Sequence, residues 1–213
     1  VKLGEPVELA AVAFAVGQVA LTAGAQRKSL SVATRAADAI GDSAGGDLAA
    51  WEGMLRLHAA LSAASLGRSD EAVAHWQAAG DAVARADGAD SWLMEATPAN
   101  VALWRVAIAL ENGEPDRAPE YARRVDRSAL RLPGRRARLH IDTGRGLFLA
   151  GRSDEAIQHF LMADKISSFD VRPRPEVREI VSQMLRDARG RGSSELRTLA
   201  VRVGVDPLAP DAT

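Results

Sequence analysis

Residues 67–76 read GRSDEAVAHW, and residues 151–160 read GRSDEAIQHF. The first six residues of these two copies are identical. Each copy continues with a β-branched residue, a His at the same offset and then a large aromatic residue. Internal similarity of this kind indicates stacked supersecondary units. Proteins built in this way usually bind partners along an extended surface, so the repeat also favours a binding function over catalysis.

The composition favours an all-α protein. Aromatic residues make up only 4 % of the 213 residues, whereas β-rich folds usually contain more of them. Ala, Leu, Arg and Glu are plentiful, and these residues form helices readily. The net charge of -1 gives no reason to expect binding to nucleic acid or to an anionic membrane. The absence of cysteine excludes disulfides, thiolate metal sites and cysteine nucleophiles.

No segment is expected to enter a membrane or to act as a secretion signal. The longest apolar stretch, residues 9–21, is interrupted by Gly17 and Gln18 and is too short to span a bilayer. Only Lys2 supplies a positive charge before this stretch, whereas a signal peptide begins with a basic region. We therefore expect a cytoplasmic location and no membrane partner.

Glycines mark the predicted turns between helices. Gly67 and Gly151 follow apolar residues at helical spacing, as a glycine after a helix C-terminus does. The Ser-Asp-Glu that follows in each copy suits a new helix N-terminus, where a capping side chain and negative charge are stabilising. Weaker versions of this pattern occur at Gly113 and Gly24. The sequence therefore predicts four helical hairpins.

The predicted fold is an all-α, right-handed α-solenoid of about four such hairpins. Turn-forming residues at 41–46, 87–98 and 132–134 separate the hairpins. Two further helices, over 176–189 and 194–203, would close the C-terminal end of the solenoid, as an open repeat array requires. We expect one domain over residues 1–206, with the capping region at 169–206 and a disordered tail at 207–213.

The hairpins resemble the tetratricopeptide repeat. Aligned on the turn glycine, the small-residue positions of that repeat fall on Ala60, Ala72 and Ala79 and again on Gly144, Ala156 and Ala163. Its aromatic position falls on Trp76 and Phe160. The resemblance implies that neighbouring helices approach closely at the small residues, with one large side chain filling the space between them.

A second resemblance covers most of the chain. The segments TPANVAL (97–103), ALENGEP (109–115), RRVD (123–126), VREIV (177–181) and ELRTLA (195–200) resemble the C-terminal half of actinobacterial helix-turn-helix regulators of the Xre type. Those proteins join an N-terminal DNA-binding domain to a tetratricopeptide sensor. No recognition-helix unit precedes Val7. The resemblance therefore implies DNA binding only through a domain missing from these residues.

Candidate catalytic and metal sites do not survive inspection. Residues 41–45 read GDSAG and match a hydrolase G-x-S-x-G pattern, but that motif needs a preceding strand. The four histidines lack the i, i+4 spacing of helical metal ligands. Acidic residues interleave with the arginines between 117 and 138, which is typical of a solvated helix face. We expect no catalytic residues, no metal and no cofactor, and therefore no enzyme.

The repeat resemblance implies a concave groove as the ligand site. Its polar members are Asn100, Arg138, Arg145 and Gln18, and its apolar members are Phe14, Met54, Leu57, Leu61, Leu103, Ile141 and Phe148. Asn100 can both donate and accept a hydrogen bond, as a peptide backbone requires. The two arginines could clamp a carboxylate, or they could simply pair with Asp142 or Glu111. Trp92 could cover the groove.

Two functions remain open from the sequence. The regulator resemblance implies a ligand-sensing and dimerisation domain that binds a short peptide or a small signal molecule and forms a homodimer. The alternative is a free-standing tetratricopeptide adaptor for protein–protein interaction.

Overall fold

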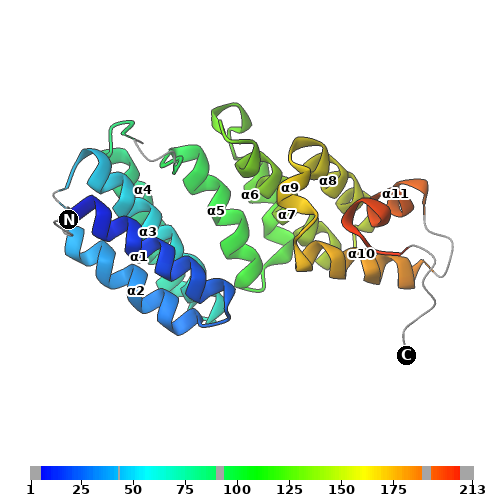
Figure 1. The fold of residues 1–213 in the computed structure, drawn as a ribbon, viewed down its shortest axis with the longest axis horizontal. Coiled ribbons are helices and arrows are strands. Elements are labelled where there is room, and N and C mark those ends of the chain that lie inside the picture. The colour runs from blue at the N-terminus through cyan, green and yellow to red at the C-terminus, as the bar shows by residue number, and fades with distance from the viewer. Residues whose placement is uncertain (1–5, 43, 90–93, 189–192, 207–213) are drawn as a thin grey trace. The chain divides into compact units, whose positions relative to one another are not determined.

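The computed structural model describes residues 6–42, 44–89, 94–188 and 193–206. Within these ranges every regular element is a helix, which confirms the predicted all-α class (Figure 1). The helices form two compact units, Val1–Gly113 and Glu114–Thr213. Trp92 and the predicted tail at 207–213 lie outside the described residues.

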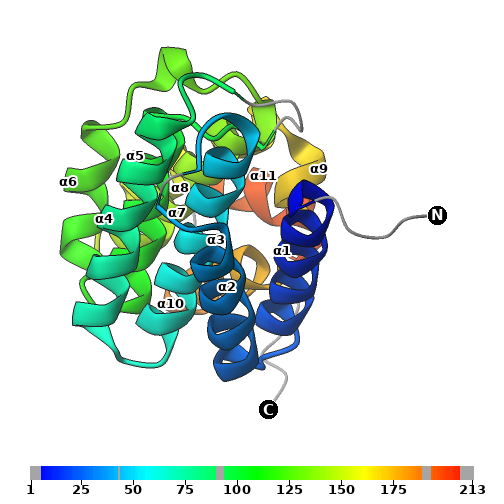
Figure 2. The same cartoon turned by 90° about the vertical axis from the view of Figure 1, so that its left-hand side faces the viewer.

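The first unit is organised around one central helix. The unit contains α1 (Pro6–Thr22), α2 (Gln26–Ile40), α3 (Gly46–Ser65), α4 (Ser69–Arg85) and α5 (Pro98–Glu111). Helix α3 packs against all four of the others, and most of its residues are buried. In Figure 2, α1 and α4 lie on opposite sides of α3. Helices α1 and α5 therefore both contact the same central helix.

The second unit contains one long hairpin and its covering helices. Its elements are the 3₁₀ turn η1 (Pro115–Arg117), α6 (Ala118–Arg123), the 3₁₀ turn η2 (Arg127–Ala129), α7 (Pro133–Leu149), α8 (Ser153–Ile166), α9 (Ser168–Val171), α10 (Pro175–Asp187) and α11 (Ser194–Val203). Helices α7 and α8 pair, α11 packs against α8, and α10 packs against both α7 and α11. The residue ranges of α10 and α11 are close to the two C-terminal helices predicted over 176–189 and 194–203.

The two copies of the repeated sequence build the same turn. Gly67 ends α3 with a φ of 72°, and Gly151 ends α7 with a φ of 75°. In each turn the following backbone N–H reaches back five residues. Arg68 N–H donates to the Ala63 carbonyl at 2.9 Å, and Arg152 N–H donates to the Leu147 carbonyl at 2.8 Å. This Schellman arrangement satisfies carbonyls left open at a helix end and favours glycine, which adopts positive φ without strain.

The weaker predicted turns also have glycines of positive φ. Gly24 has a φ of 76° between α1 and α2, and Ala25 N–H donates to the Ala20 carbonyl at 2.8 Å. Gly113 has a φ of 74° but is followed by a short 3₁₀ turn. The second helix of each repeated hairpin, α4 or α8, was predicted to begin with a capping side chain, and in this respect the structure differs. Helices α4 and α8 begin without a side-chain cap, and an arginine–glutamate pair forms there instead, such as Arg152 with Glu155 at 2.7 Å.

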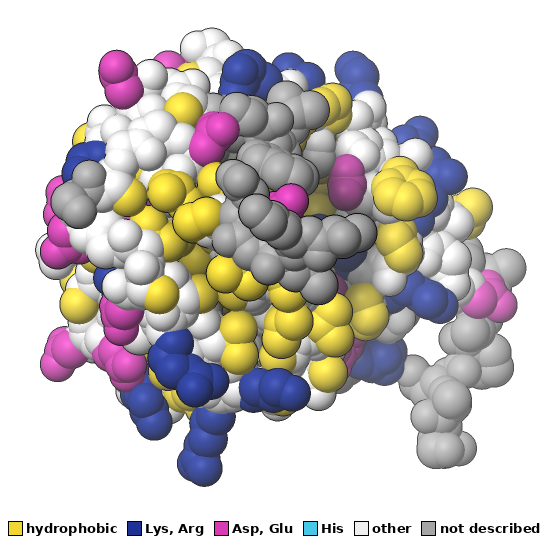
Figure 3. Space-filling view, turned by 60° about the vertical axis from the view of Figure 1, so that its left-hand side comes forward, with side chains coloured by type: hydrophobic (Ala, Val, Ile, Leu, Met, Phe, Trp, Pro, Cys, Tyr) yellow, Lys and Arg dark blue, Asp and Glu magenta, His cyan; other side chains and the backbone are white. Residues whose placement is uncertain are grey.

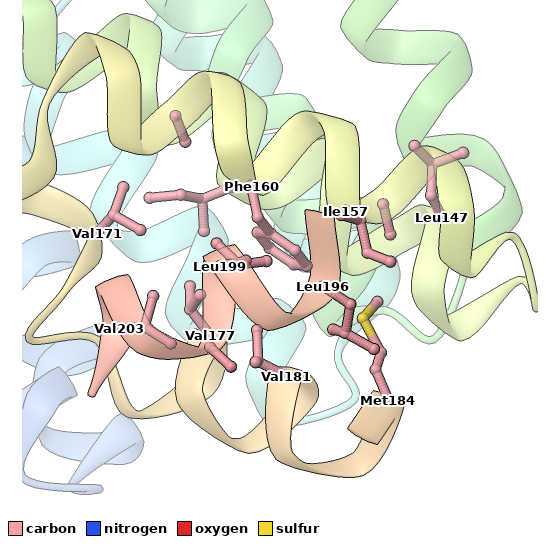
Figure 4. Packing of buried hydrophobic residues seen from close by; sticks show 14 of the residues in the cluster. Leu147, Ile157, Phe160, Val171, Val177, Val181, Met184, Leu196, Leu199 and Val203 are labelled. Atoms are coloured by element: carbon pink, nitrogen blue, oxygen red, sulfur yellow. The ribbon is translucent and has the colours of Figure 1, made fainter. Parts of the chain in front are cut away.

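The aromatic residue of the second copy fills the core of its unit. Phe160 is completely buried, and a Cβ on Gly144 would lie only 3.0 Å from the Phe160 ring. Figure 4 shows this ring among side chains of α8, α10 and α11. The surrounding buried residues include Ile157, Val177, Val181, Met184, Leu196, Leu199 and Val203. The glycine on α7 is therefore needed so that α8 can bring its ring close.

The aromatic residue of the first copy has a different environment. Trp76 is half-buried, and its Nε1 donates to the Val101 carbonyl of α5 at 2.9 Å. The Arg105 guanidinium lies 5.3 Å from the centre of the indole ring. An indole, unlike a phenyl ring, carries an N–H that needs an acceptor when it leaves water. Trp76 therefore contacts the neighbouring helix through a hydrogen bond and keeps part of its surface exposed, whereas Phe160 is completely buried.

Candidate ligand-binding site

The residues predicted to line a groove divide between the two units. In the first unit Met54, Leu57, Asn100 and Leu103 are buried, Phe14 and Leu61 are half-buried, and Gln18 is exposed. In the second unit Ile141 is buried, while Arg138, Arg145 and Phe148 are half-buried.

Asn100 stands at the start of α5 and points to the central helix. The Thr97 hydroxyl caps α5 by accepting a hydrogen bond from the Asn100 backbone N–H at 3.2 Å. The Asn100 side chain is 0 % exposed. Its Nδ2 donates a weak hydrogen bond to the Met54 Sδ of α3 at 3.7 Å. Its Oδ1 is buried and accepts no hydrogen bond from any described residue.

Trp104 lies one helical turn further along α5. Positions i and i+4 share a helix face, so Trp104 and Asn100 point in similar directions. Trp104 is 8 % exposed, and its buried Nε1 donates no hydrogen bond to any described residue. One face of α5 therefore presents a buried acceptor and a buried donor, both without protein partners in the described chain.

Aromatic and polar side chains of α1 and α3 adjoin this face. The His58 ring of α3 lies 5.8 Å from the Trp104 ring and 4.8 Å from the Phe14 ring of α1. His58 Nε2 donates to Gln18 Oε1 at 2.8 Å, because an amide oxygen can only accept. Phe14 also contacts Trp51 edge to face, with ring centres 5.8 Å apart. These contacts link α1, α3 and α5.

We call these residues the α3 cluster: Phe14, Gln18, Trp51, Met54, His58, Asn100 and Trp104. Four of them were predicted from the sequence as groove residues, and the structure brings those four together around α3. Trp51, His58 and Trp104 were missed as site residues. The spacing of Met54 with His58, and of Asn100 with Trp104, is i, i+4 on a shared face. That spacing could have identified two of the three.

The predicted arginines of the second unit contact a buried acid. Asp142 on α7 has a fully buried side chain. Its carboxylate accepts a hydrogen bond from Arg138 Nε at 2.7 Å and lies 3.5 Å from Arg145 Nη1. This is the ion-pairing alternative that the sequence left open. Both guanidinium groups therefore neutralise a charge that has no contact with water.

Two histidines of the second unit face each other across the α7–α8 hairpin. Nδ1 of His140 and Nδ1 of His159 are 3.2 Å apart, so one ring donates and the other accepts. Burial lowers the pKa of His140 from 6.5 to about 4, with smaller contributions from His159 and Arg127. Burial also lowers the pKa of His159, and Arg127 contributes in the same direction. The folded chain therefore favours neutral rings.

Because its rings are neutral in the folded chain, we expect the histidine pair to make the chain less stable in acid. Below pH 6.5 the histidines of the unfolded chain take up protons, while His140 in the folded chain does not until about pH 4. Protons bound only by the unfolded state favour unfolding. We therefore expect the free energy of unfolding to fall as the pH is lowered from about 6.5 to about 4. Thermal melts followed by circular dichroism across this range measure the effect.

Removing the pair should reduce this pH dependence. The variant His140→Leu/His159→Leu should show a shallower decline in melting temperature over the same interval. His75→Leu is the comparison: burial also lowers the pKa of His75 in the first unit, so removing this one histidine should reduce the decline less than removing the pair. An unchanged profile in the double variant would show that other groups cause the acid sensitivity.

The described residues contain no group of three or more His, Cys, Asp or Glu side chains arranged to hold a metal ion. No helix in the described ranges is both long and apolar enough to cross a membrane. Comparison with known proteins identifies no relative, because no family model, no curated protein and no solved structure matches the chain.

Proposed function

We propose that the chain is a tetratricopeptide-like sensor domain of a transcriptional regulator. It binds a short peptide or a small signal molecule and pairs as a homodimer. Contact with DNA requires a domain outside these residues. The repeated helix–turn–helix hairpins support the repeat assignment, and the α3 cluster supports the ligand-binding part. The proposed binding site is the α3 cluster of the first unit.

The observation that carries the proposal is the pair of buried polar atoms on α5. An unsatisfied buried donor or acceptor costs about 1–3 kcal/mol of stability. Such groups are rare in folded proteins, and each one calls for a specific explanation. Asn100 Oδ1 requires a donor and Trp104 Nε1 requires an acceptor. A peptide group supplies both an N–H and a C=O, so a bound peptide would satisfy the two atoms together.

The chemistry of the cluster suits recognition rather than reaction. Its members contribute amide, indole, imidazole, thioether and phenyl groups. The imidazole of His58 is held by Gln18 at 2.8 Å. Ligand sites typically combine an apolar wall with a few polar groups that fix orientation. Phe14, Trp51 and Met54 provide the wall, and Asn100 and Trp104 provide the orienting groups.

Calorimetric titration with short peptides tests this function. The probes are acetylated, amidated pentapeptides with Leu or Phe at the centre, together with the same peptides carrying a free carboxylate. We expect at least one class to bind the wild-type chain. Trp104→Phe keeps an aromatic ring but removes the N–H, so it should weaken binding about tenfold, or ~1.4 kcal/mol.

Trp76→Phe is the matched control. It also removes an indole N–H, but from a side chain that contacts the Val101 carbonyl rather than the cluster. It should leave the affinity unchanged. The proposal fails if no probe binds the wild-type chain, or if the two substitutions weaken binding equally.

A further inference from the structure

Helix α1 exposes a row of apolar side chains. Leu9, Val12, Val16 and Val19 are 59 %, 58 %, 40 % and 67 % exposed. They are spaced three, four and three residues apart, so they form one continuous stripe along the helix. We call them the α1 stripe. Figure 3 shows that hydrophobic side chains gather over a broad area of one face of the molecule.

The stripe is separate from the side of α1 that packs inward. Ala10, Gly17 and Ala20 are buried within the unit. Phe14 and Gln18 contact His58 of α3. The stripe occupies the remaining side of the helix. Glu8 is the one charged residue between Pro6 and Thr22, so this outer side is not the solvated polar face of an ordinary surface helix.

The spacing of the stripe fits a partner helix. Apolar residues alternating three and four apart are the a and d positions of a heptad, where each side chain inserts between side chains of a second helix. The pattern 9, 12, 16, 19 is also symmetric about residue 14, so it is the same when read from either end. An interface between identical subunits about a two-fold axis needs such self-complementarity.

We propose that the α1 stripe is the homodimer interface, with α1 of a second copy packed antiparallel across it. The proposal rests on the homodimer of the proposed function and assigns the surface that forms it. The two-fold axis passes near residue 14. Val12 then faces Val16 of the second copy, and Leu9 faces Val19.

The charges near the ends of α1 select the antiparallel arrangement. Glu8 is exposed near the start of α1, and Arg27 and Lys28 are exposed at the start of α2, directly after the turn that ends α1. None of the three forms an ion pair with a described residue. An antiparallel pair brings each Glu8 toward the basic residues of the other copy, at both ends. A parallel pair would instead place like charges together, which is unfavourable.

Sedimentation of the full chain tests the interface. We expect the wild-type chain at about 100 µM to sediment as a dimer, and Val12→Glu/Val19→Glu to sediment as a monomer with an unchanged helical dichroism spectrum. The control is Leu149→Glu/Val201→Glu, which changes two other exposed apolar residues and should remain dimeric. A monomeric wild-type chain, or equal dissociation by both double variants, would overturn the proposal.

Disulfide trapping tests the direction of the helices. The chain lacks cysteine, so Val12→Cys and Val16→Cys each introduce a single thiol. A disulfide requires Cα atoms about 4.4–6.8 Å apart. The antiparallel pair therefore predicts crosslinking when the two variants are mixed and oxidised, and much less when either is oxidised alone. Efficient crosslinking of each variant with itself would indicate a parallel pair and contradict the proposal.

These outcomes are independent of the peptide titration. The substitutions in the α1 stripe leave Phe14 and Gln18 in place. A monomeric chain that still binds peptide would contradict the proposed dimer interface but not the proposed ligand site. A dimer that binds none of the pentapeptides would contradict the proposed ligand site but not the proposed interface.

Discussion

Replacing Arg138 and Arg145 together with alanine is expected to destabilise the second unit by about 3–5 kcal/mol. The Asp142 carboxylate is fully buried and is neutralised by these two guanidinium groups. Without them an uncompensated charge remains away from water, which is among the most unfavourable arrangements in a protein interior. Urea unfolding followed by circular dichroism at 222 nm measures the loss.

Two companion variants show whether Asp142 causes the effect. Adding Asp142→Asn to the double variant removes the buried charge and should restore much of the lost stability. Arg152→Ala breaks only the exposed pair with Glu155 and should change stability by less than about 1 kcal/mol. If the double variant unfolds at the same urea concentration as the wild-type chain, the two arginines are not needed to neutralise Asp142. That result would favour the alternative hypothesis, in which the arginines bind a ligand carboxylate.

Asn100→Leu is expected to stabilise the chain and to weaken ligand binding. Leucine has a similar shape but no buried oxygen that needs a hydrogen-bond donor. Removing an unsatisfied buried group should raise the free energy of unfolding by about 1–3 kcal/mol. The variant loses only a weak hydrogen bond to the Met54 sulfur at 3.7 Å. We expect the melting temperature to rise by roughly 2–8 °C in calorimetry. The affinity for the pentapeptide probes should fall about tenfold, because the acceptor is gone.

Asn112→Leu, at the C-cap that directly follows the same helix, is the matched control. Asn112 Oδ1 already accepts a hydrogen bond from Ser69 Oγ at 3.3 Å, so replacing it should not raise the melting temperature. A decrease in melting temperature for Asn100→Leu would show that Asn100 is a structural residue. Stabilisation combined with unchanged peptide affinity would place the ligand elsewhere. Gain of stability with loss of binding is the usual relation at a site kept for function.

The sequence was most informative about turns and helices, because their determinants are local. A glycine with positive φ and the hydrogen bonds around it involve only about six successive residues. The same turn could therefore be recognised at Gly67 and Gly151, and even at Gly24, where the copy is weak. The short 3₁₀ turn after Gly113 was not predicted, because a shortened helix leaves no distinct signal in a few residues.

Side-chain partners were less predictable, because they come from distant parts of the chain. The repeated aromatic position illustrates this: Phe160 meets Gly144 in the core, whereas Trp76 donates to Val101 of α5. The bond between His58 and Gln18 joins positions 40 residues apart. A repeated sequence thus encodes a repeated backbone, while the surroundings of each side chain depend on which helix packs against it.

The tryptophans all belong to the first unit, so their fluorescence reports on that unit. All four lie at or before residue 104, so the first unit contains every indole and the second contains none. The single tyrosine, Tyr121, belongs to the second unit, where Arg117 and Arg124 lie within 6 Å of its ring centre. Indole fluorescence therefore follows the first unit, including Trp51 and Trp104 of the α3 cluster. Unfolding confined to the second unit leaves that signal largely unchanged while the helical dichroism falls.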